Sequence, residues 1–73
     1  MRLYQRAIVT QVLKGGTLRC YLQDNENHEV NAYPCGNMRR HRIFLCAGDE
    51  VTLELSPYDL QRGRVIWRQS VTE

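Results

Sequence analysis

A chain of 73 residues is long enough for one domain and no more, and a domain of this size has only a limited core. Hydrophobic residues make up 42% of it and charged residues 25%, which excludes a wholly disordered chain and a membrane protein. The formal net charge is only +2, so a preference for anionic partners has to be sought in the distribution of the charges.

Three stretches in the first half of the chain are rich in β-branched residues or alternate apolar and polar ones, which predicts β-strands. They are residues 5–13, 17–22 and 29–33. Gly15 and Gly16 predict a hairpin between the first two. In the second strand, Arg19 and Tyr21 fall on the face opposite the apolar positions. There a base could stack on the ring beside the guanidinium, or both side chains could be ordinary wetted surface.

A short helical turn is predicted after the third strand. Pro34 cannot donate to a β-ladder, and the Cys-Gly-Asn that follows can begin a turn of helix over residues 38–45. Met38 would then pack on the core, together with Ile43 or Leu45. The remaining side chains of the turn would face the solvent.

Residues 36–44 are the strongest candidate for function, because this segment is basic and contains no acid. Its arginines are Arg39, Arg40 and Arg42. Phosphate recognition needs positive charge on a surface that can follow a nucleic-acid backbone. His41 in the segment and Tyr33 before it would add stacking surfaces. The alternative is a solvated face whose charges balance acids nearby.

The second half of the chain predicts two more strands. Residues 50–56 alternate most clearly, and residues 56–63 form a loop by their Pro, Asp and Gly content. Residues 64–68 lack a clean period, as in a strand buried on both sides, and Trp67 is predicted to belong to the core rather than to a binding platform. A second basic patch is formed by Arg62, Arg64 and Arg68.

Five strands with a helical turn between the third and fourth follow the order of an OB-fold, an all-β Greek-key barrel that binds oligonucleotides on strands two and three and on flanking loops. Strand number alone also fits SH3-like barrels. We therefore expect residues 1–73 to form one five-stranded OB-fold domain that ends in a polar tail at residues 69–73.

No catalytic or cofactor-binding constellation is found in the sequence. Neither His28 nor His41 belongs to a nucleophile motif, and no phosphate-cradling glycine loop is present. Cys35, His41 and Cys46 follow one another at intervals of six and five residues, which differ from the close pairs typical of zinc sites. We expect no enzyme, no metal and no cofactor.

The chain has three cysteines, an odd number, and they occur without a C-x-x-C pair. The first residues lack the apolar core of a signal peptide, and no run of eighteen apolar residues exists. These features predict a cytoplasmic protein without an export signal or membrane span.

Two stretches carry a resemblance to a known family. They are Gly36-Asn-Met-Arg-Arg, and Ala47-Gly-Asp-Glu-Val-Thr-Leu-Glu-Leu-Ser-Pro-Tyr-Asp-Leu-Gln-Arg-Gly-Arg-Val-Ile-Trp-Arg. Both resemble bacterial translation initiation factor one, with the same order and spacing of motifs. The resemblance extends over about residues 7–68 and is strongest from residue 36 onward.

The resemblance implies an OB-fold factor, S1-like, that binds ribosomal RNA in the A site of the small ribosomal subunit and works with initiation factors two and three. It would act as a monomer, touch a nearby ribosomal protein and catalyse nothing. By position, the residues that match the family's RNA-contacting helix and its basic loop before the last strand are Met38, Arg39 and Arg40, and Arg62, Gly63 and Arg64.

Several positions depart from the family pattern. Asn37 stands in place of a Lys, Arg42 in place of a Tyr and Phe44 in place of an Arg. The turn over residues 23–31 is about two residues longer, and a usual Gly is absent around Ala7. The chain therefore resembles a divergent member.

Two other functions remain open from the sequence. One is a general single-stranded RNA chaperone resembling cold-shock domains, which would stack bases on Tyr21, Tyr33 and His41. The other is a protein-interaction module, since OB barrels host many functions.

Overall fold

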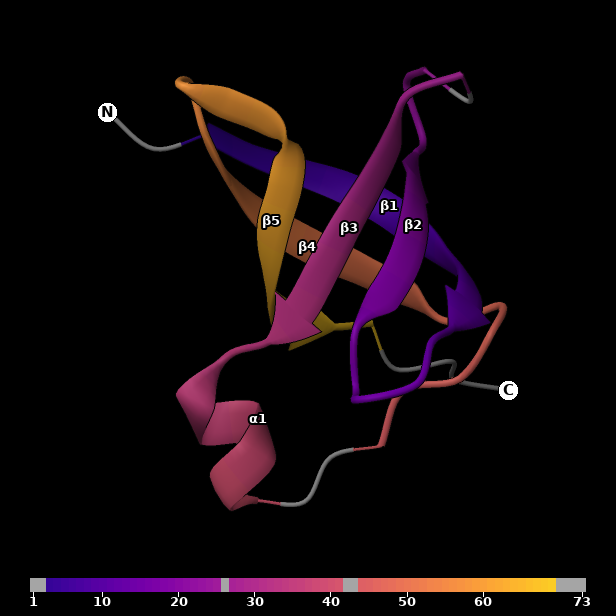
Figure 1. The fold of residues 1–73 in the computed structure, drawn as a ribbon, viewed down its shortest axis with the longest axis vertical. Coiled ribbons are helices and arrows are strands. Elements are labelled where there is room, and N and C mark those ends of the chain that lie inside the picture. The colour runs from indigo at the N-terminus through magenta and orange to yellow at the C-terminus, as the bar shows by residue number, and fades with distance from the viewer. Residues whose placement is uncertain (1–2, 26, 42–43, 70–73) are drawn as a thin grey trace.

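Five β-strands and one short helix make up the part of the chain that the computed structural model describes, residues 3–25, 27–41 and 44–69. The elements are β1 (Leu3–Val12), β2 (Leu18–Leu22), β3 (Glu29–Pro34), α1 (Gly36–Arg40), β4 (Glu50–Ser56) and β5 (Asp59–Arg68) (Figure 1). The predicted all-β chain with a helical turn between the third and fourth strands is confirmed.

The strands form a closed barrel in the order β1-β2-β3-β5-β4, and β4 pairs with β1 to complete it. All neighbouring strands are antiparallel except β3 and β5, which run parallel. Closure leaves no free sheet edge over the paired residues, which protects so small a sheet from pairing with another chain. Figure 1 shows α1 outside the barrel, beyond the end of β3.

The core consists of the inward residues of all five strands plus one residue of the helix. Its members are Ala7, Val9, Leu18, Cys20, Leu22, Val30, Ala32, Met38, Val51, Leu53, Leu55 and Val65. Most are small or β-branched, as the narrow interior of a five-stranded barrel requires. The predicted inward positions of β2, β3 and β4 and the predicted packing of Met38 are confirmed. Leu45 packs against the edge of this cluster.

The helix is shorter than predicted, because α1 ends at Arg40 instead of continuing to Leu45. Two turn hydrogen bonds hold it, from the backbone N–H of Arg39 to the Cys35 carbonyl and from that of His41 to the Asn37 carbonyl. Met38 is its one buried residue. An isolated helix this short is unstable in water, so it extends only as far as its packing supports it.

The last strand begins earlier than predicted. Residues 59–63 were expected in a loop, but β5 starts at Asp59, so Arg62 and Gly63 lie within the strand. They pair in parallel with Asn31 and Ala32 of β3. Such a pairing joins residues that are 31 positions apart in the sequence and cannot be recognised from local turn residues.

The prediction that Trp67 belongs to the core is wrong, because 60% of its surface is exposed. The cause is an irregularity in the pairing of β4 and β5, where Leu53 faces Val65 but the adjacent Thr52 faces Trp67. Ile66 is thus the extra residue of a β-bulge, which shifts the side-chain alternation by one position. The expectation that this strand is buried on both sides is wrong for the same reason.

Gly63 lies at the tightest point of the barrel wall. A Cβ atom built there would lie 2.8 Å from Cδ2 of Leu55, 3.2 Å from Cγ1 of Val30 and 3.3 Å from the backbone oxygen of Glu54. Leu55 can turn away in part, but the backbone oxygen cannot. Gly63 is therefore required for close approach between β5 and its two neighbours.

The change Gly63→Ala is expected to lower the free energy of unfolding by about 1–3 kcal/mol, as overpacking does in a tight core. Urea denaturation monitored by circular dichroism measures this. The matched control is Gly36→Ala, because a Cβ at Gly36 would meet no atom within 4 Å beyond its chain neighbours and the backbone of its own helix. In α1 the control should keep or slightly raise stability, since Ala favours helix over Gly. Equal losses from both changes would contradict the steric account.

The three thiols lie in different environments. Cys20 is buried in the barrel, Cys35 is half-buried and Cys46 is exposed. Burial raises the pKa of the Cys20 thiol to about 11 because its charged form would lose its hydration.

At pH 8 we expect Cys46 to react first with dithionitrobenzoate and Cys35 more slowly. Cys20 should react only when the barrel opens, since its thiol stays both protonated and inaccessible below a pKa of about 11. Reaction kinetics with and without urea measure the three rates. Fast modification of all three thiols in the folded protein would contradict this burial.

Within the described ranges, no helix has both the length and the apolar character needed to cross a membrane.

Candidate nucleic-acid interface

The basic helix α1 presents its arginines to solvent. Arg39, Arg40 and His41 are all exposed, whereas Met38 faces the core and holds the helix against the barrel. The guanidinium carbon of Arg39 lies 5.9 Å from the centre of the Tyr33 ring, within the range of a cation–π contact. This contact connects the helix to the outer face of β3. Arg42 lies outside the described residues.

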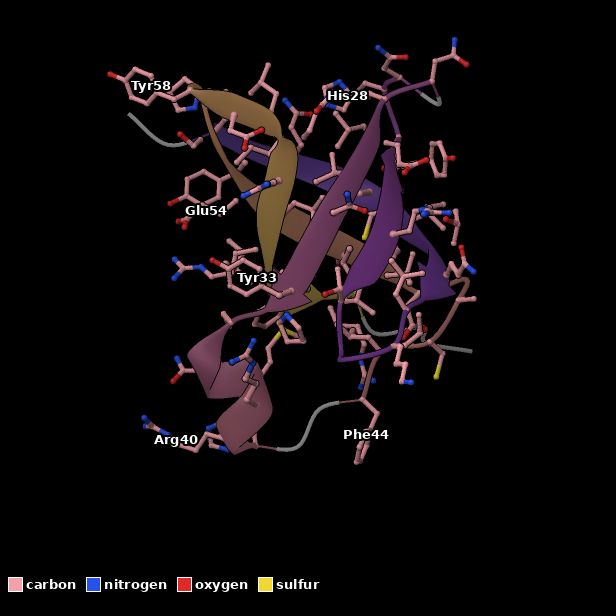
Figure 2. All side chains as sticks on the ribbon, viewed as in Figure 1. His28, Tyr33, Arg40, Phe44, Glu54 and Tyr58 are labelled. Atoms are coloured by element: carbon pink, nitrogen blue, oxygen red, sulfur yellow. The ribbon has the colours of Figure 1, made fainter. Side chains whose placement is uncertain are left out.

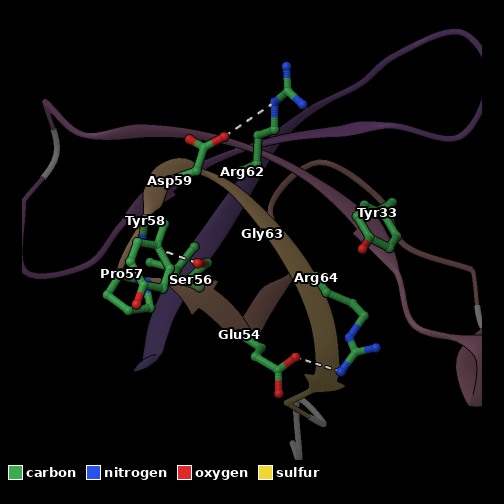
Figure 3. A pocket seen from close by; sticks show the side chains of 10 residues that line it. Tyr33, Glu54, Ser56, Pro57, Tyr58, Asp59, Arg62, Gly63 and Arg64 are labelled. Atoms are coloured by element: carbon green, nitrogen blue, oxygen red, sulfur yellow. Dashed lines mark hydrogen bonds and ion pairs between the residues drawn. The ribbon is translucent and has the colours of Figure 1, made fainter. Parts of the chain in front are cut away.

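A pocket of about 520 Å³ opens beside this contact, around the turn between β4 and β5. Figure 3 shows Tyr58 and Tyr33 on opposite sides of it, with Arg62 and Arg64 between them. Tyr58 is 97% exposed and Tyr33 is 48% exposed, so both rings offer a face to a ligand. The two aromatic walls and the two cations make the pocket suitable for a flat, negatively substituted group such as a nucleotide.

The two pocket arginines are held differently. Nη2 of Arg64 lies 2.5 Å from Oε1 of Glu54, whose side chain is only 16% exposed, and this ion pair fixes the guanidinium in the wall. Nε of Arg62 lies 3.6 Å from the Asp59 carboxylate, but the Arg62 side chain is 83% exposed. An ion pair in so much water is weak, so Arg62 can exchange the carboxylate for a phosphate at little cost.

The register of the strands places four predicted site residues on one outer face. Arg19 is opposite Asn31, which is opposite Arg62, and the next outward pair is Tyr33 and Arg64. With Arg39 over Tyr33, the surface that these side chains form extends from β2 across β3 and β5 to α1. Figure 2 shows Tyr33 between Arg40 on the helix and Glu54 on the barrel. We call this surface the basic face.

The β2 end of the basic face is already occupied by internal contacts. Nε of Arg19 lies 3.1 Å from Oε1 of Glu29, and its Nη1 donates to Oε1 of Gln11 at 3.0 Å. The Tyr21 hydroxyl donates to Oε2 of Glu29 at 2.8 Å, and this bond and the carboxylate charge raise the pKa of Tyr21. Of the two interpretations given for Arg19 and Tyr21, this network favours ordinary surface, and Glu29 adds negative charge there.

The second basic patch is only partly assembled. Arg62 and Arg64 meet in the pocket, but Arg68 lies beyond the bulge and donates from Nη1 to the Phe44 carbonyl oxygen at 2.9 Å. Gly63 is buried between the two pocket arginines and serves the packing of the wall.

Tyr58 and Glu54 were not selected from the sequence as site residues. Tyr58 follows a proline in a turn, and an aromatic side chain in an exposed turn is a usable signal. Glu54 carried no such signal, because its role depends on Arg64, which faces it across β4 and β5.

Across the described ranges, no three side chains of His, Cys, Asp or Glu gather in a way that could hold a metal ion.

No protein-family model matches the chain. It is 46% identical over 61 residues to translation initiation factor IF-1 of Nitrobacter hamburgensis and, to the same extent, to that of Rhodopseudomonas palustris. The alignments include 84% of this chain and 63% of each relative, so the chain spans less than two thirds of the length of these curated relatives.

Solved structures show the same fold. Translation initiation factor IF-1 from the Wolbachia endosymbiont of Brugia malayi matches 97% of this chain and 82% of its own, with 32% identity and a TM-score of 0.75. YjeQ from Thermotoga maritima matches with a TM-score of 0.74 over 93% of this chain and 23% of its own. At 16% identity, that match concerns the fold alone. The resemblance noted in the sequence is thus confirmed, and the chain belongs to the translation initiation factor IF-1 family.

Proposed function

We propose that this chain is a translation initiation factor that binds the A-site region of the small ribosomal subunit through ribosomal RNA. The observation that carries the proposal is the basic face, in which Arg39, Tyr33 and Arg64 form one continuous outer surface. Family membership supports the same function, since the relatives are named as initiation factors.

The mechanism is steric and electrostatic. Arg39 and Arg40 project from a helix that the barrel holds in place, so they can neutralise RNA phosphates without first being ordered. The pocket would receive an unpaired base between Tyr33 and Tyr58 while Arg62 meets its phosphate. Met38 and Gly63 are buried and would position these groups rather than touch RNA.

Bound in this way, the factor would occupy the A site and block premature entry of transfer RNA. We further propose that it acts as a monomer in the cytoplasm, contacts a nearby ribosomal protein and assists initiation factors two and three. His41 and Arg42 follow directly on Arg40 and would extend the phosphate contacts.

Binding to purified bacterial small subunits tests the proposal. The labelled chain is competed with an unstructured RNA across a salt series, with and without initiation factors two and three. Subunit binding that free RNA does not displace, and that the other factors strengthen, would support the proposed role. Equal affinity for any single strand would indicate a general RNA chaperone. Binding that survives high salt and does not need RNA would indicate a protein-interaction module.

The double change Arg39→Ala and Arg40→Ala should weaken subunit binding and flatten its salt dependence. Each lost phosphate contact on single-stranded RNA removes about 0.7 from the slope of log affinity against log salt, so the slope should fall by about 1.4. The matched control is the double change to Lys, which keeps both charges and should keep the slope. An unchanged slope in the alanine variant would exclude phosphate contacts by these residues.

The change Tyr58→Ala should lower RNA affinity about tenfold or more without altering stability. Tyr58 is 97% exposed, so removing its ring takes nothing from the core, whereas stacking of one base contributes about 1–3 kcal/mol. Affinity from the same competition assay and the urea midpoint together measure this. Tyr58→Phe keeps the ring and should bind almost normally. A variant that binds RNA as tightly as the unmodified chain would remove Tyr58 from the interface.

A further inference from the structure

We propose that the exposed indole of Trp67 is a second stacking site, which takes an unpaired base of the bound RNA outside the pocket. The inference rests on the proposed function, since it requires that the chain binds RNA. Trp67 was expected in the core, and it does not belong to the basic face.

A β-bulge in β5 turns the Trp67 side chain outward. If β5 alternated regularly from the buried Val65, then Ile66 would face out and Trp67 would face in. The bulge at Ile66 reverses this and places Trp67 opposite Thr52, an outward residue of β4. Bulges that re-aim a side chain are common next to functional sites. Here the bulge exposes the largest apolar side chain in the sequence. This is notable because a domain this small has few apolar side chains with which to build its core.

The surroundings of Trp67 are polar and carry charges of both signs. Across β4, Thr52 pairs with Trp67 on one side and with Arg6 of β1 on the other. The Arg6 side chain is 58% exposed, and its ion pair with Glu50 is long, at 3.5 Å. An aromatic residue that anchors a protein–protein contact usually lies in a well-packed pocket from which water is excluded, and Thr52 and Arg6 do not form one. An exposed aromatic platform on a polar surface, with Arg6 one strand further across the sheet, is instead suited to a stacked base whose phosphate lies nearby.

The position of Trp67 also fits a single RNA strand that continues from the pocket. Trp67 follows Arg64 by three residues on β5, which is about 10 Å along a strand. Both residues face outward beside β4, where Arg64 pairs with Glu54 and Trp67 with Thr52. A strand with one base between Tyr33 and Tyr58 can therefore reach the indole along the outer surface of β5.

Trp67 is the single tryptophan of the sequence, so the indole emission of the chain reports on this site alone. The experiment titrates the chain with protein-free ribosomal RNA of the small subunit, which contributes no indole emission. Affinities for this RNA and for intact subunits are then compared for the unmodified chain, Trp67→Leu and Trp67→Phe. Because the side chain is exposed, urea unfolding should show that the Trp67→Leu variant is as stable as the unmodified chain.

Stacking predicts that RNA quenches the emission, that Trp67→Leu loses about tenfold in affinity for both targets, and that Trp67→Phe, which keeps a ring, loses less. Salt-sensitive RNA binding with unchanged emission and an unaffected Trp67→Leu variant would overturn the inference and leave the proposed function standing. Weaker binding of Trp67→Leu to subunits alone, without quenching by RNA, would assign the indole to a protein of the subunit and would also overturn it. No binding of the unmodified chain to either target would reject the proposed function and the inference together.

Discussion

The whole structure depends on β5, which pairs with β3 on one side and with β4 on the other. Without it the remaining strands form an open sheet with two free edges, and the inward residues face no opposite wall. The close approach of these three strands at Gly63 is what allows the double pairing. Arg62 and Arg64 flank this glycine and point outward, so the residue that closes the barrel also sets the spacing of the pocket cations.

The basic face results from the same arrangement. Because β3 and β5 run parallel and in register, Tyr33 and Arg64 are neighbours even though they are distant in the sequence. The short helix that follows β3 then brings Arg39 over the Tyr33 ring. The face is therefore made by four segments that the barrel brings together, β2, β3, β5 and α1, and the ion pair with Glu54 fixes the Arg64 guanidinium.

Predictions from the sequence were correct for side-chain directions that follow from alternation within one strand. They were wrong where a side-chain direction or a strand boundary depends on pairing with a distant strand. The inward positions of residues 51, 53 and 55 follow from a period of two that the structure preserves. Trp67 could not be assigned, because a bulge depends on how β4 pairs with β5 and leaves no trace in composition. The start of β5 was missed because Asp59 pairs with Ser56 across a turn whose Pro, Asp and Gly residues are typical of a loop, and because Arg62 and Gly63 pair with β3, far back in the chain. Similarly, arginines could be selected by charge, but the acids that hold them, Glu29 and Glu54, became visible only across strands.

The order of the strands has a consequence for biosynthesis. The strand that closes the barrel, β5, follows the other four in the chain. The edge of β1 that does not pair with β2 stays unpaired until β4 has been made. While the chain is being made, β3 and β4 therefore each expose a row of unpaired backbone groups. Folding is completed only after β5 has left the ribosomal tunnel, in a step dominated by distant contacts that is slow for a chain of this length. The newly made protein thus passes through a stage in which it is prone to pair with other chains.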